Sequence, residues 1–528
     1  METMYLKSNV QVEPLFGRWY AWSHLIPPAT AARNITERHL KIMESYVSAP
    51  QIHAAAVKNP KMLGGPFIDY GGERVEEIAE LRDQTKRMQS HLIELSHAIA
   101  DLDSLLRKEA TGYSLQPLYA RVPPILRGFV ELVYDLNNHP SFRILETLLY
   151  RSMYYDRSAQ SLALSLISTD ERPFVLSTPR LDSNYTVHLK HSFDSDIIDW
   201  LFRAKRIPVP WEDIRNRLTQ DDERTAVLRT MFTDTPPKPY QRYVGPGIRW
   251  RYFGHACILV ETSEMSILFD PVLSYTYESG ISRYTYDDLP DKIDYVVITH
   301  NHQDHILFET LLQIRHKVDT FIVPRNNTGS LQDPSVKLLL EFSGCKHVIE
   351  IDDLHEITFP NGGITAIPFL GEHADLDIRS KSGYVVRFGS HRLMFLADSC
   401  NVEPKLYEHV HRQLGDMDAL FIGMECDGAP LSWLYGPLLC QKVHREMDQS
   451  RRLSGSDFDQ AFAMVDQFKC REVYVYAMGQ EPWLNYIMSI KYTEASRPIV
   501  ESDRLLAECK SRGILAERLF GEKEILID

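Results

Sequence analysis

A short segment in the second half of the chain carries most of the residue types that bind metal ions. It reads His300-Asn301-His302-Gln303-Asp304-His305 and directly follows the apolar run 295–299. A buried strand that ends in three imidazoles and a carboxylate places these side chains on a tight loop at a sheet edge. The first two histidines can serve one metal ion, while the aspartate and the third histidine turn toward another. The loop therefore predicts a centre for two metal ions.

Two further aspartates follow apolar runs and are candidates for the same centre. Asp398 comes after the run 393–396, and its two oxygens could bridge a pair of ions. Asp270 comes after the run 266–269 and is a candidate for the acceptor that orients a ligand histidine. A turn or helix cap is the alternative role for either residue. His255 either lines the site or is a structural histidine with its hydrogen bonds satisfied.

The segment Leu370-Gly371-Glu372-His373-Ala374-Asp375 supplies two more potential ligands. Neighbouring residues of an extended segment point in opposite directions, so we expect only one of Glu372 and His373 to face the metal ions. If Glu372 is the ligand, the set becomes three imidazoles and three carboxylates. Mixed sites of this kind with open positions suit iron, whereas zinc sites are richer in imidazole.

Three segments together resemble the metallo-β-lactamase superfamily. They are Phe253-Gly254-His255-Ala256, Ile267-Leu268-Phe269-Asp270-Pro271 and the run from Ile298 to His305. The resemblance covers roughly residues 247–480. It implies an αββα sandwich with metal ions at one sheet edge, and it implies that Asp398 is the bridging ligand. One departure is that the superfamily usually supplies a late histidine, whereas this chain has none after His444.

A closer resemblance extends over most of the chain. With Gly17-Arg18-Trp19-Tyr20-Ala21-Trp22 near the start and residues 476–483 near the end, the sequence is similar to the dinuclear iron β-hydroxylases of nonribosomal peptide biosynthesis, including that of the chloramphenicol pathway. The iron ligands that this resemblance implies are His300, His302, Asp304, His305, Glu372 and Asp398. Glu372 and Asp398 are also implied as the catalytic residues, with Glu372 shifting when the substrate arrives.

The resemblance implies an oxygenase. Two iron ions, dioxygen and an external electron donor would hydroxylate the β-carbon of an amino acid. The amino acid would be held as a thioester on the phosphopantetheine arm of a carrier domain, and the enzyme would be a homodimer through its N-terminal domain. The alternative is a metal-dependent hydrolase, a lactonase or phosphodiesterase, in which His373 binds zinc or manganese. A third class is a non-catalytic module that retains the site.

The elements that must position these residues fall into two predicted domains. A chain of 528 residues is too long for one core, and the proline- and glycine-rich stretch 235–247 suits a linker. We therefore expect a mixed α/β domain over 1–245, for dimerisation and carrier contact, and a metallo-β-lactamase-like domain over 246–528. Helices are predicted over 72–110, 211–231, 309–316 and 457–468. Strands are predicted over 258–260, 266–269, 295–299, 320–323, 347–351, 384–388, 393–396, 419–422 and 473–476.

The apolar stripe of the 72–110 helix allows two interpretations. It packs on its own domain, or it forms a dimer seam, because the stripe continues for several heptads. Two aromatic residues near the C-terminal side, Trp433 and Tyr435, are candidates for pocket lining or core. Arg203-Ala204-Lys205-Arg206 and Arg451-Arg452 are candidate patches for docking an acidic carrier domain, against the alternative of ordinary surface charge.

The bulk composition narrows the class of protein. The net charge of −14 argues against a general nucleic-acid or anionic-membrane binder, because phosphate binding needs a basic face. No apolar run approaches the ~18 residues of a membrane span, and the N-terminus lacks the apolar core of a signal peptide. The seven cysteines are odd in number and unpaired in spacing, which favours a reducing cytoplasm. We therefore expect a cytoplasmic enzyme.

Overall fold

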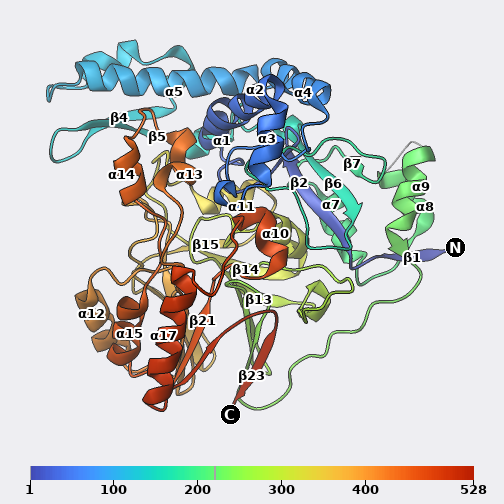
Figure 1. Cartoon of the computed structure of the whole chain (residues 1–528), viewed down its shortest axis with the longest axis vertical. Coiled ribbons are helices and arrows are strands. Elements are labelled where there is room, and N and C mark those ends of the chain that lie inside the picture. Colours follow the sequence, from blue (N-terminus) through green and yellow to red (C-terminus); the bar gives the residue numbers. More distant parts are fainter. Residues whose placement is uncertain (1, 219–221) are drawn as a thin grey trace.

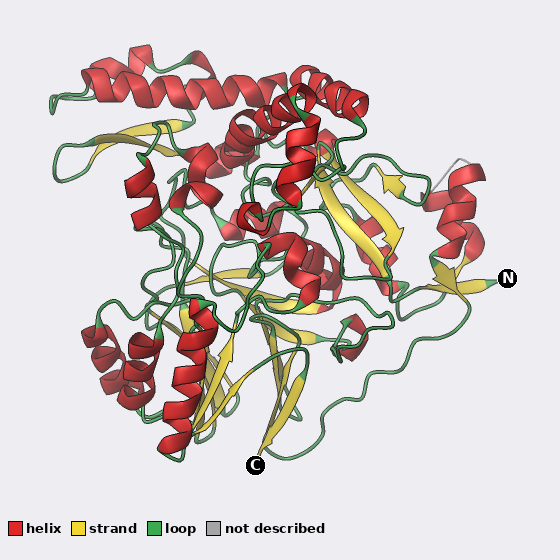
Figure 2. Ribbon diagram, in the orientation of Figure 1, coloured by secondary structure: helices red, strands yellow, loops and turns green. Residues whose placement is uncertain are grey.

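The second half of the chain forms two seven-stranded sheets packed face to face (Figure 2). The computed structural model describes residues 2–218 and 222–528. In pairing order, the first sheet comprises β15 (Val348–Ile351), β14 (Val318–Pro324), β13 (Ile293–Val297), β12 (Ser266–Phe269), β11 (Ile258–Glu261), β10 (Ile248–Tyr252) and β23 (Lys523–Ile527). The second comprises β16 (Glu356–Phe359), β17 (Gly362–Ile367), β18 (Gly383–Phe388), β19 (His391–Phe395), β20 (Ala419–Gly423), β21 (Glu472–Tyr476) and β22 (Leu515–Arg518).

Apolar side chains fill the space between the sheets and cover the outer face of each. Aromatic rings dominate the space between them, where Phe395 stacks on Phe269 with ring centroids 4.1 Å apart. The outer face of the second sheet packs against α12 (Pro404–Leu414), α15 (Phe458–Gln467) and α17 (Arg497–Ser511). On the other side, α10 (Phe308–Ile314) and α11 (Val336–Phe342) contribute buried residues to a second core. The layers are those of an αββα sandwich, and this prediction is confirmed.

Each of the nine predicted strands coincides with an observed strand, with ends that differ by about two residues, the usual uncertainty of such boundaries. The pattern missed β10, β16, β17, β22 and β23. In β10 the alternating residues Arg249 and Arg251 disguise the strand, because both guanidinium groups pair with Glu261 of the neighbouring strand β11. The other missed strands are half-exposed, or begin with two glycines, and so lack the apolar runs that indicated the rest.

The N-terminal part combines helices with small antiparallel sheets (Figure 1). One sheet has the order β3 (Trp19–Tyr20), β2 (Val10–Phe16), β6 (Gln160–Leu166) and β7 (Val187–Leu189), and another has β8 (Val209–Pro210), β1 (Thr3–Leu6) and β9 (Phe232–Thr233). A hairpin joins β4 (Val130–Tyr134) to β5 (Pro140–Ile144). No helix in the described part of the chain is long and apolar enough to cross a membrane.

The predicted helix over 72–110 is in fact two helices. α4 (Val75–Met88) ends where Gln89 leaves helical geometry, with φ −111° and ψ 24°, and α5 (Ser90–Glu109) begins directly after it. The apolar stripe is buried in the chain's own core, through Ile78, Leu81, Leu92, Leu95, Ile99, Leu102 and Leu106. The helices therefore pack on their own domain, and the interpretation of this stripe as a dimer seam is wrong.

The predicted helix over 211–231 corresponds to α8 (Trp211–Leu218) and α9 (Asp222–Thr230). The part of this prediction that falls on 219–221 lies outside the described residues. After β9, residues 234–247 are all described and contain no helix or strand, and they cross to β10 as one long loop (Figure 1). The core that contains α10 continues into the N-terminal part, so the boundary near residue 245 stays a prediction.

A buried cluster of charges connects the N-terminal part to helix α10. Arg172 lies between two carboxylates, 2.7 Å from Oε1 of Glu13 on β2 and 2.8 Å from Oε2 of Glu309 on α10. Arg180 adds a second guanidinium, 2.9 Å from Glu13. Tyr20 donates a hydrogen bond to Glu309 at 2.8 Å. Because α10 begins three residues after His305, this cluster fixes the helix that carries the chain away from the histidine-rich loop.

We predict that Arg172→Met destabilises the protein by about 3–5 kcal/mol, because it leaves the carboxylates of Glu13 and Glu309 buried without their common cation. The measurement is urea unfolding followed by circular dichroism. The matched control is Arg512→Met, since Arg512 pairs with Glu508 at the surface and such pairs contribute at most about 1 kcal/mol. Equal losses of unfolding free energy in the two variants would contradict the role assigned to the buried charge cluster.

Candidate metal centre

The histidine-rich loop begins three residues after β13 ends and closes into a tight turn before α10. The backbone N–H of Ile306 donates to the carbonyl of His302 at 2.9 Å, which brings the two ends of the turn together. All six residues from His300 to His305 are buried. β13 pairs in parallel with β12 and β14, so the loop lies at the edge where the carboxyl ends of these strands meet. This is the edge that the sequence predicted for the metal ligands.

Donor atoms gather here into groups of three, each within 4.8 Å of one another. The groups in the described part of the chain are His300, His302 and Glu372; His300, His305 and Asp398; and His255, Asp304 and His305. Neighbouring groups share a histidine, so the donors form one continuous series. Such a series has room for two ions side by side, and it contains all six residues that the sequence proposed as ligands.

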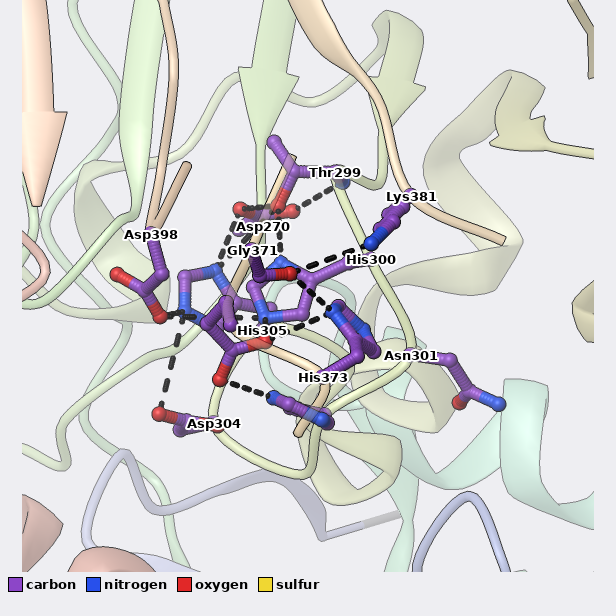
Figure 3. A network of polar contacts seen from close by, with 12 residues as sticks. Asp270, Thr299, His300, Asn301, Asp304, His305, Gly371, His373, Lys381 and Asp398 are labelled. Carbon is purple, nitrogen blue, oxygen red and sulfur yellow. Dashed lines mark hydrogen bonds and ion pairs between the residues drawn. The ribbon is translucent and has the colours of Figure 1, made fainter. Parts of the chain in front are cut away.

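The distances divide the series into two halves with Asp398 between them. In one half, Oε1 of Glu372 lies 2.7 Å from Nδ1 of His302, and its Oε2 lies 3.7 Å from Nε2 of His300. In the other half, Oδ2 of Asp398 lies 3.0 Å from Nε2 of His305 (Figure 3). The same oxygen is 3.9 Å from Nε2 of His300. Oδ2 of Asp398 therefore lies between His300 and His305, the two histidines that neighbouring donor groups share.

Several atoms in this cluster are buried without a hydrogen-bond partner. They include Nε2 of His300, Oε2 of Glu372 and Oδ1 of Asp398. Leaving such groups unsatisfied costs about 1–3 kcal/mol each, so native proteins rarely tolerate several together. Divalent cations would satisfy all of them. Three imidazoles with three carboxylates form a mixed nitrogen and oxygen set that fits iron.

Burial and mutual proximity shift the pKa values of the cluster in opposing directions. Burial raises the pKa of Glu372 to about 7. Burial, with the nearby imidazoles of His305 and His302, holds the pKa of His300 well below its ordinary value. Burial also pulls the pKa of His305 down, but the carboxylates of Asp398 and Asp304 outweigh it and hold that pKa well above its ordinary value. Metal binding would displace the protons that Glu372 and His305 hold, because ligands bind metal ions in their deprotonated forms.

Asp270 orients His305 from behind. Its Oδ2 lies 2.8 Å from Nδ1 of His305, which leaves Nε2 facing Asp398 (Figure 3). Thr299 fixes the carboxylate in turn, donating its backbone N–H to Oδ1 at 2.7 Å and its hydroxyl to Oδ2 at 2.5 Å. The structure thus gives Asp270 the contact that the sequence proposed for it. Partners of this kind set the ring orientation and the basicity of a metal-binding histidine.

The segment that contains Glu372 and His373 is a turn, not the extended chain that the sequence analysis assumed. Glu372, Ala374 and Asp375 have φ values of 65°, 51° and 54°, so the rule of alternating faces does not apply to them. Both side chains point toward the cluster: the ring of His373 stacks on that of His302 with centroids 4.5 Å apart. Among the described residues, however, the donor groups include Glu372 and leave His373 out.

The structure also brings in two residues whose roles the sequence left open. Nε2 of His255 lies 3.2 Å from Asp304 and 3.2 Å from Nε2 of His305. Its carbonyl accepts a hydrogen bond from the N–H of Ala477, at the strand end where the superfamily usually places its late histidine. The hydroxyl of Tyr435 lies 2.8 Å from Nε2 of His302, so this buried aromatic residue contacts the centre directly.

A cavity of about 460 Å³ opens onto the centre. His302, Asp304, Glu372 and Asp398 form its inner wall, and Leu63 and Gly64 from the N-terminal part and Trp433 also line it. A second hollow of about 660 Å³ shares Gly64 and Lys491, among other residues, with the first, so the two are contiguous. The path to the metal centre thus runs between the two halves of the chain.

Comparisons with known proteins agree over nearly the whole chain. Residues 5–236 match the model of the diiron non-haem β-hydroxylase N-terminal domain, and residues 266–454 match a β-lactamase superfamily domain. The 4-amino-L-phenylalanyl-[CmlP-peptidyl-carrier-protein] 3-hydroxylase of Streptomyces venezuelae is 41% identical over 523 residues, which are 97% of this chain and 98% of that protein.

Two solved structures have the same fold throughout. The crystal structure of CmlA, a diiron β-hydroxylase from Streptomyces venezuelae, has a TM-score of 0.94 at 40% identity and covers 99% of both chains. A glutamate-to-aspartate mutant of CmlA has a TM-score of 0.92 at 39% identity, covering 99% of this chain and 100% of that one.

We predict that Glu372→Ala lowers the iron content from about two ions per chain to about one, because it removes the only carboxylate of its donor group. His373→Ala is the matched control and should keep both ions, since it removes an adjacent imidazole that belongs to no donor group in the described residues. The measurement is elemental analysis of protein loaded with ferrous ion, together with its optical spectrum. Loss of iron in the His373 variant alone would show that His373, and not Glu372, is the metal ligand.

Proposed function

The chain belongs to the family of diiron non-haem β-hydroxylases, and from this premise we propose that it hydroxylates the β-carbon of an amino acid held as a thioester on a carrier domain. The observation that carries the proposal is the continuous series of metal donors in space, which begins with the group of His302 and ends with the group of Asp304. The carboxylate of Asp398 lies between the two halves of this series. The relative from Streptomyces venezuelae acts on an aminoacyl group bound to a peptidyl carrier protein.

We propose that two iron ions are held by His300, His302, Asp304, His305, Glu372 and Asp398. With electrons from an external donor, an iron pair supplies the activation of dioxygen that insertion into a C–H bond requires. The protein itself contributes the geometry of the site and excludes water from it. Asp398 holds the two halves of the donor series at a fixed separation, and the ligands are buried. Glu372, on a turn with left-handed backbone, is the ligand that we propose to shift on substrate arrival.

The hydrolase alternative is less well supported. It requires an imidazole-rich zinc or manganese site in which His373 is a ligand, whereas the donor groups of the described residues include Glu372 in that place. The relatives that match along the whole chain are hydroxylases.

We propose that the carrier domain approaches where the two contiguous hollows open, a surface that includes Arg452 of the second suggested patch. In the first patch, Lys205 is buried against Gln313, and Arg206 donates to the carbonyls of Lys238 and Asp287. In the second, both arginines donate to neighbouring backbone carbonyls. Lys491, by contrast, is exposed and lines both hollows. We propose that it receives the phosphate of the phosphopantetheine arm.

We further propose a homodimer, through a surface other than the buried stripe of α4 and α5. The β4–β5 hairpin lies beside α5 at the edge of the molecule (Figure 1). Leu136 at the tip of the hairpin is exposed, and so are Leu148 and Met153, which follow the hairpin closely in the chain; we propose that they form one apolar surface. We also propose a cytoplasmic location, because all seven cysteines are free, as a reducing compartment keeps them.

We predict that the iron-loaded protein, given dioxygen and a reductant, adds one oxygen atom to the aminoacyl group of a charged carrier domain. Mass spectrometry of carriers charged with different amino acids measures the gain and identifies the preferred residue. The same protein loaded with zinc should leave every substrate unchanged, because zinc has no redox chemistry. Turnover with zinc in the absence of dioxygen would establish the hydrolase instead.

We predict that the double variant Leu136→Asp with Leu148→Asp is monomeric by light scattering at concentrations where the unmodified protein is dimeric. The charges would have to be buried without partners at the proposed interface, which is strongly unfavourable. The control is Leu526→Asp on β23, an exposed leucine far along the chain from the hairpin. A double variant that stays dimeric would remove this surface from consideration.

A further inference from the structure

One carboxylate in the cavity keeps an unpartnered oxygen and belongs to none of the donor groups. Glu425 lies two residues beyond the end of β20 and lines the cavity together with Asp398 and Glu372. Its Oε1 accepts one hydrogen bond, from the backbone N–H of Asp427 at 3.3 Å. Its Oε2 is buried and has no hydrogen-bond partner. Within the described part of the chain, no ion pair involves this side chain.

The loop that carries Glu425 is held rigidly against the metal centre. At the end of β20, a Cβ on Gly423 would lie 2.4 Å from Oδ1 of Asp398, so only glycine allows the strand to approach the bridging carboxylate this closely. The carbonyl of Glu425 accepts a hydrogen bond from Gly455 at 2.8 Å. Further along, Leu453 donates to the carbonyl of Ala429 at 2.8 Å. The backbone of Glu425 therefore has a fixed position beside the reacting region.

Burying a carboxylate oxygen without an ion pair is costly, and the environment of Glu425 shows that cost. Burial raises the pKa of Glu425 to about 8, and the negative charge of Asp398 adds to the rise. A cationic ligand that entered the cavity would remove both effects, because an opposite charge favours the ionised carboxylate. The site is thus electrostatically suited to a positively charged group.

We propose that Glu425 binds the α-ammonium group of the aminoacyl substrate and so selects amino acids over acyl groups that lack nitrogen. This inference rests on the function proposed above. In an aminoacyl group the nitrogen lies two bonds from the β-carbon, roughly 2.5 Å away by ordinary bond lengths. A β-carbon presented to the metal ions therefore keeps its ammonium group within this cavity, whose lining includes Glu425 as well as Asp398 and Glu372. Glu425 acts as a specificity-determining residue that positions the substrate.

The test combines one substitution with one change of substrate. Glu425→Gln keeps the shape of the side chain and removes its charge. The preferred aminoacyl carrier is compared with a carrier bearing the same acyl group with hydrogen in place of the α-nitrogen. Binding of each carrier to the iron-loaded, reduced enzyme is measured without dioxygen by fluorescence anisotropy, and hydroxylation is then measured by mass after dioxygen is added.

We expect the unmodified enzyme to bind the aminoacyl carrier at least about tenfold more tightly than the carrier without nitrogen, since a charge-assisted hydrogen bond is at stake. Glu425→Gln should bind the two carriers equally and weakly, while retaining two iron ions per chain. The control is Asp427→Asn on the same loop, because Asp427 is exposed and its carboxylate lies 3.6 Å from Arg452. This variant should keep the preference of the unmodified enzyme.

The outcomes separate this inference from the proposed function. If the unmodified enzyme hydroxylates no aminoacyl carrier, the proposed function fails. If it does, and Glu425→Gln still prefers the aminoacyl carrier about tenfold, the role of Glu425 is refuted while the function stands. Loss of iron from Glu425→Gln would also overturn the inference, because the carboxylate would then serve the metal ions and not the substrate.

Discussion

The structure depends on a group of imidazoles and carboxylates that is buried without enough partners of its own. His300, Glu372 and Asp398 each keep an unsatisfied atom in the same small volume. Such a cluster is unfavourable until cations occupy it, so metal binding and the stability of the catalytic part are thermodynamically linked. The surrounding sandwich supplies the rigidity. Parallel strands deliver the loop to one edge, and Asp270 with Thr299 fixes the ring of His305 from behind.

The N-terminal part is more than an attached domain. Its charges clamp α10, the helix that leaves the metal loop, through Arg172 between Glu13 and Glu309. Its residues Leu63 and Gly64 also form a wall of the cavity. Substrate access is therefore a property of the interface between the two halves. This arrangement suits a substrate tethered to another protein, since the hollow between the halves leads from the surface to the metal centre.

Carboxylates near the centre have different partners and, accordingly, different roles. Asp398 faces two histidines and has the geometry of a bridge, whereas Asp270 faces one histidine from outside the donor groups. Glu425 lines the cavity, and its buried Oε2 has no hydrogen-bond partner. Glu425 shares this cavity with the metal ligands, and we propose that the amino group of a substrate is its partner. Burial makes these groups unfavourable in free energy when they lack partners, and the same burial makes their interactions strong and selective.

The sequence by itself determined the metal loop, the strand ends that carry Asp270 and Asp398, and a layered domain of strands and helices, because local spacing and apolar runs encode these features directly. The αββα order of the layers came from the resemblance to a known superfamily. It did not determine the break at Gln89, the strands with alternating arginines, or the turn that brings Glu372 and His373 to the same side. The turn depends on positive φ values at Glu372, Ala374 and Asp375, and the arginine strand depends on ion pairs with Glu261 of the neighbouring strand. The roles of His255, Tyr435 and Glu425 were likewise decided only by tertiary structure. Each of these residues is ordinary in its local sequence and distinctive only for what the fold places against it.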